Sequence, residues 1–134
     1  MEPLLILIAD DSEDDIIQLG YALRQAGLAP QVVTVENGAE ALAYFAEVER
    51  GAAARPDLVF ADLRLPLNDG LELVAAVNAS ERMRGVPVIL LFGGGSLPPE
   101  EVTALGAAAN LMTKPVSPQA LRASIGRLAP DRLV

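Results

Sequence analysis

Short, unbroken apolar runs alternate with longer amphipathic segments along this chain, and the alternation restricts the folds open to it. Leu4–Ala9 and Leu58–Ala61 are apolar at every position, as strands covered on both faces must be. Between such runs, apolar residues recur at helical spacing, as at Ile16, Leu19 and Leu23. This order of elements predicts a parallel sheet with helices on both faces.

Capping and turn residues place five strand–helix units. We expect strands at Leu4–Ala9, Gln31–Val35, Leu58–Ala61, Val86–Phe92 and Asn110–Thr113. We expect helices from Ser12 to Gly27, Asn37 to Gly51, Asp69 to near Gly85, Pro98 or Pro99 to Gly106, and Ser117 through Leu128. The predicted fold is one α/β domain over residues 1–134. It is a flavodoxin-like, doubly wound sheet of five parallel strands in the order 2-1-3-4-5.

Ser12 and Asp15 give the first helix a capping-box signal. In such a box each side chain bonds the backbone N–H of the other residue. We therefore expect Ser12 to cap this helix and the Asp15 side chain to complete the capping box in its first turn.

The composition excludes several classes of function. The 134 residues include no cysteine and no histidine, which removes disulfides, thiolate chemistry, histidine-ligated metals and Ser-His-Asp catalysis. A net charge of −8 and 4% aromatic residues argue against nucleic-acid binding. No apolar run approaches the roughly 20 residues that a membrane helix needs. The N-terminal run lacks the basic flank of a signal peptide, so we expect a cytoplasmic protein.

Charged residues follow three of the predicted strands at the same edge of the sheet. Asp10 and Asp11 follow the first strand, Asp62 follows the third, and Lys114 follows the fifth. Ligands of such sheets bind at the carboxyl ends of the strands, where the strand order reverses. Clustered carboxylates favour a hard cation such as Mg²⁺. A carboxylate can also attack phosphorus, and an ammonium can neutralise the transferring group.

Each of these residues also has a purely structural interpretation. Asp10 and Asp11 could cap the first helix, Asp62 could be a turn residue before Pro66, and Lys114 could be a solvated lysine. Their joint occurrence at three strand ends favours one shared pocket.

Three motifs of the chain resemble those of response-regulator receiver domains in bacterial two-component signalling. They are Leu5-Ile6-Leu7-Ile8-Ala9-Asp10-Asp11-Ser12, the run Pro56-Asp57-Leu58-Val59-Phe60-Ala61-Asp62 continuing to Asp69-Gly70, and Thr113-Lys114-Pro115. The opening acids and the run Glu36-Asn37-Gly38-Ala39-Glu40-Ala41-Leu42 are most similar to stand-alone receivers found beside phytochrome-type kinases.

The resemblance implies roles for individual residues. Asp62 would accept a phosphoryl group from a sensor histidine kinase or a phosphotransfer protein. Mg²⁺ would bind Asp11, Asp62 and the backbone carbonyl of Arg64 directly, and Asp10 through water. Lys114 would bind a phosphoryl oxygen, and the Lys114-Pro115 bond would be cis.

The resemblance also bears on partners. We expect no DNA-binding or enzymatic output domain, so the signal would pass to a downstream protein by direct contact, without nucleic acid or membrane. The protein would not be an enzyme beyond self-dephosphorylation. A homodimer could form through the last helices and the fifth strand, by analogy alone.

The chain departs from the family at the two positions that usually report phosphorylation. Phe92 stands where these domains carry Ser or Thr, and Leu111 stands where they carry an aromatic residue. Two interpretations stay open. The readout could differ, with Gly93-Gly94-Gly95-Ser96 cradling phosphate oxygens, although a flexible loop is the simpler interpretation of these glycines. Alternatively, the chain could be a degenerate receiver that binds partners constitutively.

Two other families fit less well. Haloacid-dehalogenase phosphatases carry a second Asp two positions after the nucleophile, where this chain has Arg64. A flavodoxin would need a phosphate loop after the first strand, where Asp10 and Asp11 would repel phosphate.

Overall fold

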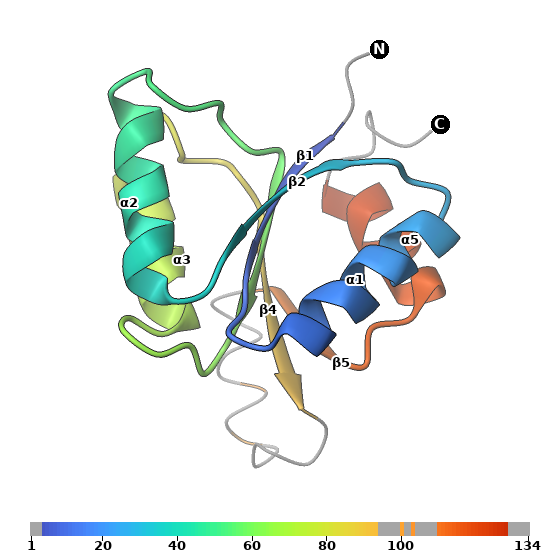
Figure 1. Cartoon of the computed structure of the whole chain (residues 1–134). Helices are drawn as coiled ribbons and strands as arrows, with labels where there is room; N and C mark the ends of the chain where they lie inside the picture. Colours follow the sequence, from blue (N-terminus) through green and yellow to red (C-terminus); the bar gives the residue numbers. More distant parts are fainter. Residues whose placement is uncertain (1–3, 94–99, 101–102, 104–109, 129–134) are drawn as a thin grey trace.

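The structure is a computed structural model that describes residues 4–93, 100, 103 and 110–128. Five parallel strands form one sheet in the order β2-β1-β3-β4-β5 (Figure 1), which confirms the predicted topology. The strands are β1 (Leu5–Ala9), β2 (Gln31–Val35), β3 (Leu58–Asp62), β4 (Val88–Gly93) and β5 (Asn110–Lys114). In this order β1 and β3 are neighbours, with Ala9 opposite Ala61. The ends of β1 and β3 therefore lie side by side.

Helices cover both faces of the sheet, as predicted. The described helices are α1 (Glu13–Gln25), α2 (Gly38–Glu49), α3 (Gly70–Ala79) and α5 (Pro118–Leu128). α1 and α5 cover one face, and α2 and α3 cover the other (Figure 1). Alternate residues of each central strand feed two separate apolar clusters: Leu7 and Val59 pack on the α2 and α3 side, while Ile8 and Phe60 pack on the α1 and α5 side.

The caps predicted at Ser12 and Asn37 are confirmed, and Asp69, where the third helix was predicted to open, caps α3 in the same way. The side chain of Ser12 accepts a hydrogen bond from the N–H of Asp15 at 3.3 Å. Asn37 and Asp69 accept the equivalent bonds at the starts of α2 and α3, at 2.8 and 3.0 Å. Each cap satisfies a helical N–H that would otherwise lack a partner. These bonds fix the points at which the helices begin.

Some element boundaries differ from the sequence prediction. α3 ends at Ala79 rather than near Gly85, because Ser80 has an extended backbone and its Oγ accepts from the N–H of Met83 at 3.1 Å. β4 begins at Val88, two residues later than expected. Most of the helix predicted from Pro98 or Pro99 to Gly106 lies outside the described residues; Glu100 and Thr103 are described, and both are helical.

None of the helices in the described part of the chain is long and apolar enough to cross a membrane.

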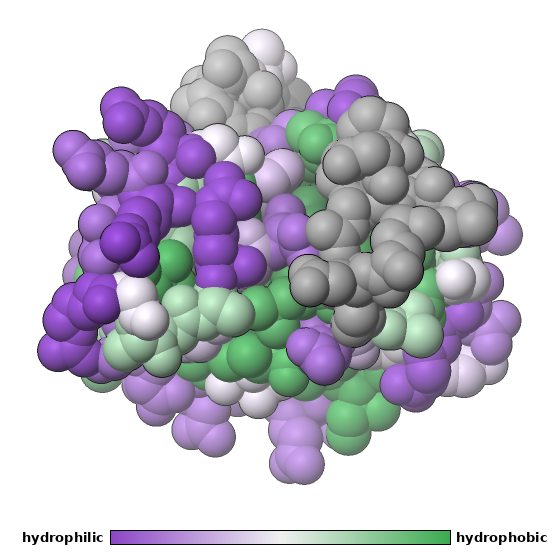
Figure 2. Space-filling model, turned by 90° about the horizontal axis from the view of Figure 1, so that it is seen from above, coloured by the Kyte–Doolittle hydropathy of each residue, from purple (hydrophilic) through white to green (hydrophobic). Residues whose placement is uncertain are grey.

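Figure 2 views the molecule from the end at which the strands begin, where hydrophilic side chains gather on the α2 side. Arg55 lies in the loop just before β3. Its Nε donates to the backbone oxygen of Arg82 at 2.8 Å, and its Nη2 donates to that of Arg84 at 3.2 Å. Arg55 therefore ties the segment that enters β3 to the turn that enters β4, at the end of the sheet opposite Asp62.

The loop from β3 to α3 packs closely against the start of α2. Leu67 and Asn68 both have positive φ angles, of 51° and 75°, and the N–H of Gly38 donates to the oxygen of Pro66 at 3.0 Å. A Cβ added at Gly38 would lie 1.9 Å from the backbone oxygen of Asn68. A glycine at this position therefore lets the loop after Asp62 rest on α2.

We predict that Gly38→Ala destabilises the protein by about 1–3 kcal/mol, because the new methyl group clashes with backbone that cannot rotate away. Urea unfolding followed by circular dichroism measures the change. Gly20→Ala is the matched control, since the nearest atom to its added Cβ is 3.9 Å away and alanine favours a helix interior by about 0.5–1 kcal/mol. Equal stability of the two variants would contradict the proposed packing.

Candidate acidic site at the strand ends

The sheet brings the three predicted acids together. Carboxylate oxygens of Asp10, Asp11 and Asp62 all lie within 4.8 Å of one another. Asp10 is buried with 2% exposure, Asp11 is exposed, and Asp62 is intermediate. The convergence follows from the adjacency of β1 and β3, because parallel strands end at the same edge.

Lys114 joins this cluster from the far edge of the sheet. It is the one lysine among the ten basic residues of the chain. Its Nζ donates to Asp10 Oδ2 at 2.9 Å, to Asp15 Oδ2 at 2.7 Å and to Asp62 Oδ2 at 2.7 Å. All three N–H groups of the ammonium thus have carboxylate acceptors.

Strand periodicity explains why these side chains meet. Asp10, Asp62 and Lys114 each lie two residues beyond a side chain that packs beneath α1 and α5, namely Ile8, Phe60 and Met112. Because side chains alternate between faces along a strand, the three charged groups emerge on the α1 and α5 side.

Asp15 is a site residue that the sequence interpretation missed. The capping box assigned to it is only half formed, since the N–H of Ser12 donates to Asp10 Oδ1 at 2.9 Å. The carboxylate of Asp15 instead binds Lys114. The sequence did contain a signal for this role. Asp15 lies one helical turn after Asp11, at the end of α1 nearest the strand tips.

The two oxygens of Asp62 have different partners. Oδ1 accepts from the backbone N–H of Arg64 at 2.9 Å, and Oδ2 accepts from Lys114. Asp62 therefore ends β3 with its carboxylate held from both sides. Its side chain remains 19% exposed, so a group from solvent can reach it.

Burial and hydrogen bonding act in opposite directions on the buried charges. Burial raises the pKa of Asp10, although hydrogen bonds from Lys114 and the Ser12 N–H partly oppose the shift. For Lys114, burial alone would lower the pKa, but the hydrogen bonds to Asp15, Asp62 and Asp10 together raise it above its usual value. Lys114 is therefore a permanent cation at neutral pH.

The donor set fits a hard divalent cation. Oxygens of Asp10, Asp11 and Asp62 cluster at one open edge, and Mg²⁺ is bound in proteins by one or two carboxylates together with water and phosphate oxygens. One ammonium cannot balance four nearby carboxylates, so a second cation would relieve their repulsion.

Phe92 and Leu111 lie on the other side of the sheet. Both are partly buried and pack against the apolar cluster beneath α2 and α3. In the strand register Phe92 pairs with Thr113, and Leu111 pairs with Leu90. Gly94, Gly95 and Ser96 lie outside the described residues, so the predicted phosphate cradle stays a prediction.

The Lys114–Pro115 peptide bond is cis, as the resemblance to receiver domains implied.

Comparison with known proteins agrees with this geometry. Residues 6–126 match the response regulator receiver domain. The chain belongs to this family. Receiver domains are signalling modules of two-component systems. The transcriptional regulatory protein GlrR of Escherichia coli is 33% identical over 124 residues, which cover 92% of this chain and 26% of that protein. The chain also spans 58% of FilR2 of Methanothrix harundinacea, so it corresponds to only part of these relatives.

Solved structures of receivers share the fold. The bacteriophytochrome response regulator RtBRR superposes with a TM-score of 0.78 at 26% identity, over 96% of this chain and 79% of that one. The receiver domain of a Pseudomonas aeruginosa sensor histidine kinase gives a TM-score of 0.74 at 26% identity, over 95% of this chain and 98% of that one. That structure has a magnesium ion coordinated in its active site cleft.

We predict that Lys114→Met destabilises the protein by about 2–4 kcal/mol at pH 7, because it leaves Asp10 buried without its cation. Loss of that cation raises the pKa of Asp10 further, so the folded variant binds more protons than the unfolded chain and its stability falls as pH rises. The deficit relative to wild type should therefore shrink as pH falls toward about 4, near the pKa of an aspartate in the unfolded chain, and should be smallest below it.

Urea unfolding in metal-free buffer across this pH range measures the deficit. Arg127→Met removes a positive charge outside the cluster and serves as the control. A deficit that is constant with pH would contradict the charge pairing.

Proposed function

We propose that this receiver accepts a phosphoryl group on Asp62 in a two-component pathway and signals by protein contacts. The observation that carries the proposal is the ammonium of Lys114, which lies 2.7 Å from Asp62 and 2.9 Å from Asp10. A cation held beside a partly exposed carboxylate is what a phosphoryl acceptor needs, because the transferring group is anionic.

The reaction would be a simple displacement. An oxygen of Asp62 attacks the phosphorus of a phosphorylated donor, a P–O bond forms, and the bond from phosphorus to the donor breaks with its electrons. Lys114 would then donate to a phosphoryl oxygen, while the Arg64 N–H keeps the other oxygen of Asp62 in place. The donor would be a sensor histidine kinase or a phosphotransfer protein.

Mg²⁺ would supply further neutralisation of the phosphoryl oxygens. Asp11 and Asp62 would be its carboxylate ligands, the backbone carbonyl of Arg64 a third, and Asp10 a partner through water. Support comes from the clustered oxygens of the acids and from the magnesium in the related Pseudomonas aeruginosa receiver.

The proposal extends to the downstream partner and to self-association. A downstream protein would read the phosphorylated state in the cytoplasm, and the last helices with β5 could support a homodimer. The acidic balance of the chain, −8, disfavours nucleic acid as the target.

Phe92 favours a second candidate, a constitutive interaction module without switching. A phenyl ring has no hydroxyl to donate to a phosphoryl oxygen, and Phe92 packs into the cluster beneath α2 and α3. Phosphorylation and readout therefore need separate tests.

The first test is phosphorylation itself. With Mg²⁺ and acetyl phosphate, we expect intact mass spectrometry to show one added phosphoryl group on the wild type and none on Asp62→Asn. Chelation of the metal should suppress the adduct. A folded wild type that binds Mg²⁺ in calorimetry yet forms no adduct would favour the constitutive module.

The second test concerns readout. In the wild type we expect phosphorylation to shift backbone amide NMR signals near Asp62 and to leave those around Leu111 nearly unchanged. Phe92→Thr should extend the shifts to β5, because it restores a hydroxyl at the end of β4, and should lose about 1–3 kcal/mol of stability with the partly buried ring.

Leu111→Thr is the matched control for this readout, since it removes an apolar side chain from the same cluster and adds no hydroxyl at the tip of β4. Large shifts around Leu111 in phosphorylated wild type would show that coupling does not need the hydroxyl.

A further inference from the structure

We infer that Asp15 is a positioning residue for phosphoryl transfer, which holds the ammonium of Lys114 over Asp62. The inference rests on the proposed function of Asp62. Its structural basis is the 2.7 Å ion pair between Asp15 and Lys114, a contact made from α1 rather than from a strand end.

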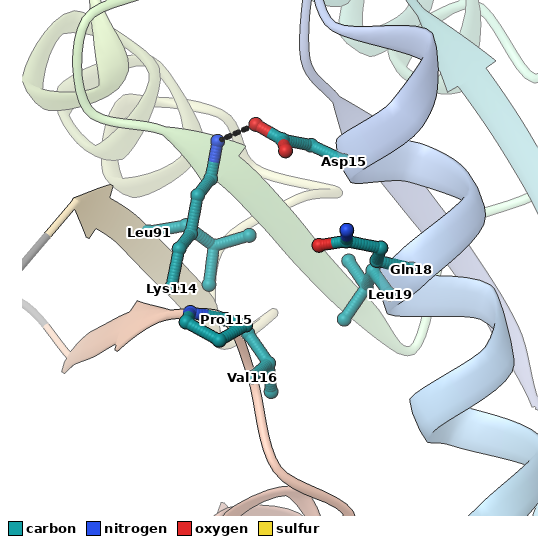
Figure 3. A pocket seen from close by; sticks show the side chains of 7 residues that line it. All are labelled: Asp15, Gln18, Leu19, Leu91, Lys114, Pro115 and Val116. Atoms are coloured by element: carbon teal, nitrogen blue, oxygen red, sulfur yellow. Dashed lines mark hydrogen bonds and ion pairs between the residues drawn. The ribbon is translucent and has the colours of Figure 1, made fainter.

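Lys114 needs such support because it reaches across the sheet. β5 is separated from β3 by β4, and in the register Lys114 lies opposite Gly93 while Asp62 lies opposite Leu91. Figure 3 shows the lysine side chain running beside Leu91 to its ion pair with Asp15. A lysine side chain has many rotamers, and ordering it carries an entropic cost. Asp15, a fixed partner on α1, restricts the ammonium to a position beside Asp62.

Hydrogen bonds at the start of α1 leave the Asp15 carboxylate available to bind Lys114. In a full capping box its carboxylate would bind the N–H of Ser12, but Asp10 Oδ1 accepts that N–H at 2.9 Å. Ser12 still caps the helix through the N–H of Asp15. The backbone of Asp15 is thus fixed by the cap while its carboxylate stays available to Lys114.

The three hydrogen bonds of Lys114 can be kept both when Asp62 is a free carboxylate and when it carries a phosphoryl group. An ammonium has three N–H groups, which face Asp10, Asp15 and Asp62. When Asp62 becomes an acyl phosphate its carboxylate charge is lost, and a phosphoryl oxygen becomes the stronger acceptor. The N–H that faces Asp62 can turn to that oxygen while Asp10 and Asp15 keep the other two.

A different role for Asp15 predicts the opposite result. If its negative charge mainly repelled the phosphoryl group, loss of the charge would speed phosphorylation. If the carboxylate mainly holds Lys114, removing the side chain slows phosphorylation, and an uncharged hydrogen-bond acceptor restores part of the rate. Asp15→Ala and Asp15→Asn therefore separate the two roles.

The experiment compares the wild type, these two variants and Asp14→Ala. Asp14 is an exposed acid in the same first turn of α1, so its loss has the same effect on charge and helix dipole without touching the pairs of Lys114. With acetyl phosphate and saturating Mg²⁺, we expect Asp15→Ala to slow phosphorylation roughly tenfold. Asp15→Asn should be intermediate and Asp14→Ala close to wild type. Calorimetry should find similar Mg²⁺ affinity in all four proteins.

A second readout needs no phosphorylation. Because Lys114 is the one lysine of the chain, ¹⁵N-lysine labelling gives a single side-chain ammonium signal. We expect its protons to exchange with water slowly in the wild type and Asp14→Ala, and several-fold faster in Asp15→Ala.

The outcomes separate the two proposals. No adduct on wild type would overturn the function proposed for Asp62 and this inference with it. A phosphorylated wild type matched in rate by Asp15→Ala would overturn the inference alone, as would faster phosphorylation of both Asp15 variants.

Discussion

The ammonium of Lys114 is the contact on which the charged end of this molecule depends. Four carboxylates, those of Asp10, Asp11, Asp15 and Asp62, gather near one another, and their mutual repulsion opposes folding. The apolar clusters on both faces of the sheet supply the free energy that holds the strand ends together in spite of this repulsion. One cation shared by three of the acids offsets part of it and leaves the site acidic enough to attract a second, divalent cation.

Much of this arrangement could be predicted from the sequence, because it follows from topology and strand periodicity. Unbroken apolar runs predicted a doubly covered parallel sheet, and parallel strands end at one edge. Residues two positions beyond Ile8 and Phe60 then emerge on the same face. The meeting of Asp10 with Asp62 needed no further information. The position of Lys114 at the end of the fifth strand likewise predicts that it lies at the same edge.

What could not be predicted depends on competition between local hydrogen bonds. The pattern from Ser12 to Asp15 predicts a capping box, but the box forms only in part because the Asp10 carboxylate accepts the hydrogen bond from the Ser12 N–H. Likewise α3 ends early because Ser80 bonds the N–H of Met83, a choice that helical periodicity does not reveal. In both cases a polar side chain close in sequence outcompetes the regular pattern. For Asp15 that competition decides whether a residue belongs to the helix or to the site.

The sheet also separates the residues of the proposed acceptor site from the two positions at which receiver domains usually read out phosphorylation. Lys114, Asp10 and Asp62 emerge toward α1 and α5, whereas Phe92 and Leu111 pack toward α2 and α3. Neighbouring residues of one strand face opposite sides of the sheet. Leu91 therefore packs on the α1 and α5 side, and Phe92 packs on the α2 and α3 side. Substitutions at the readout positions therefore need not disturb the acidic site. A chain can therefore keep the acidic cluster and Lys114 while it lacks the hydroxyl and the aromatic ring at positions 92 and 111, so the proposed phosphorylation is physically consistent with the loss of the usual readout.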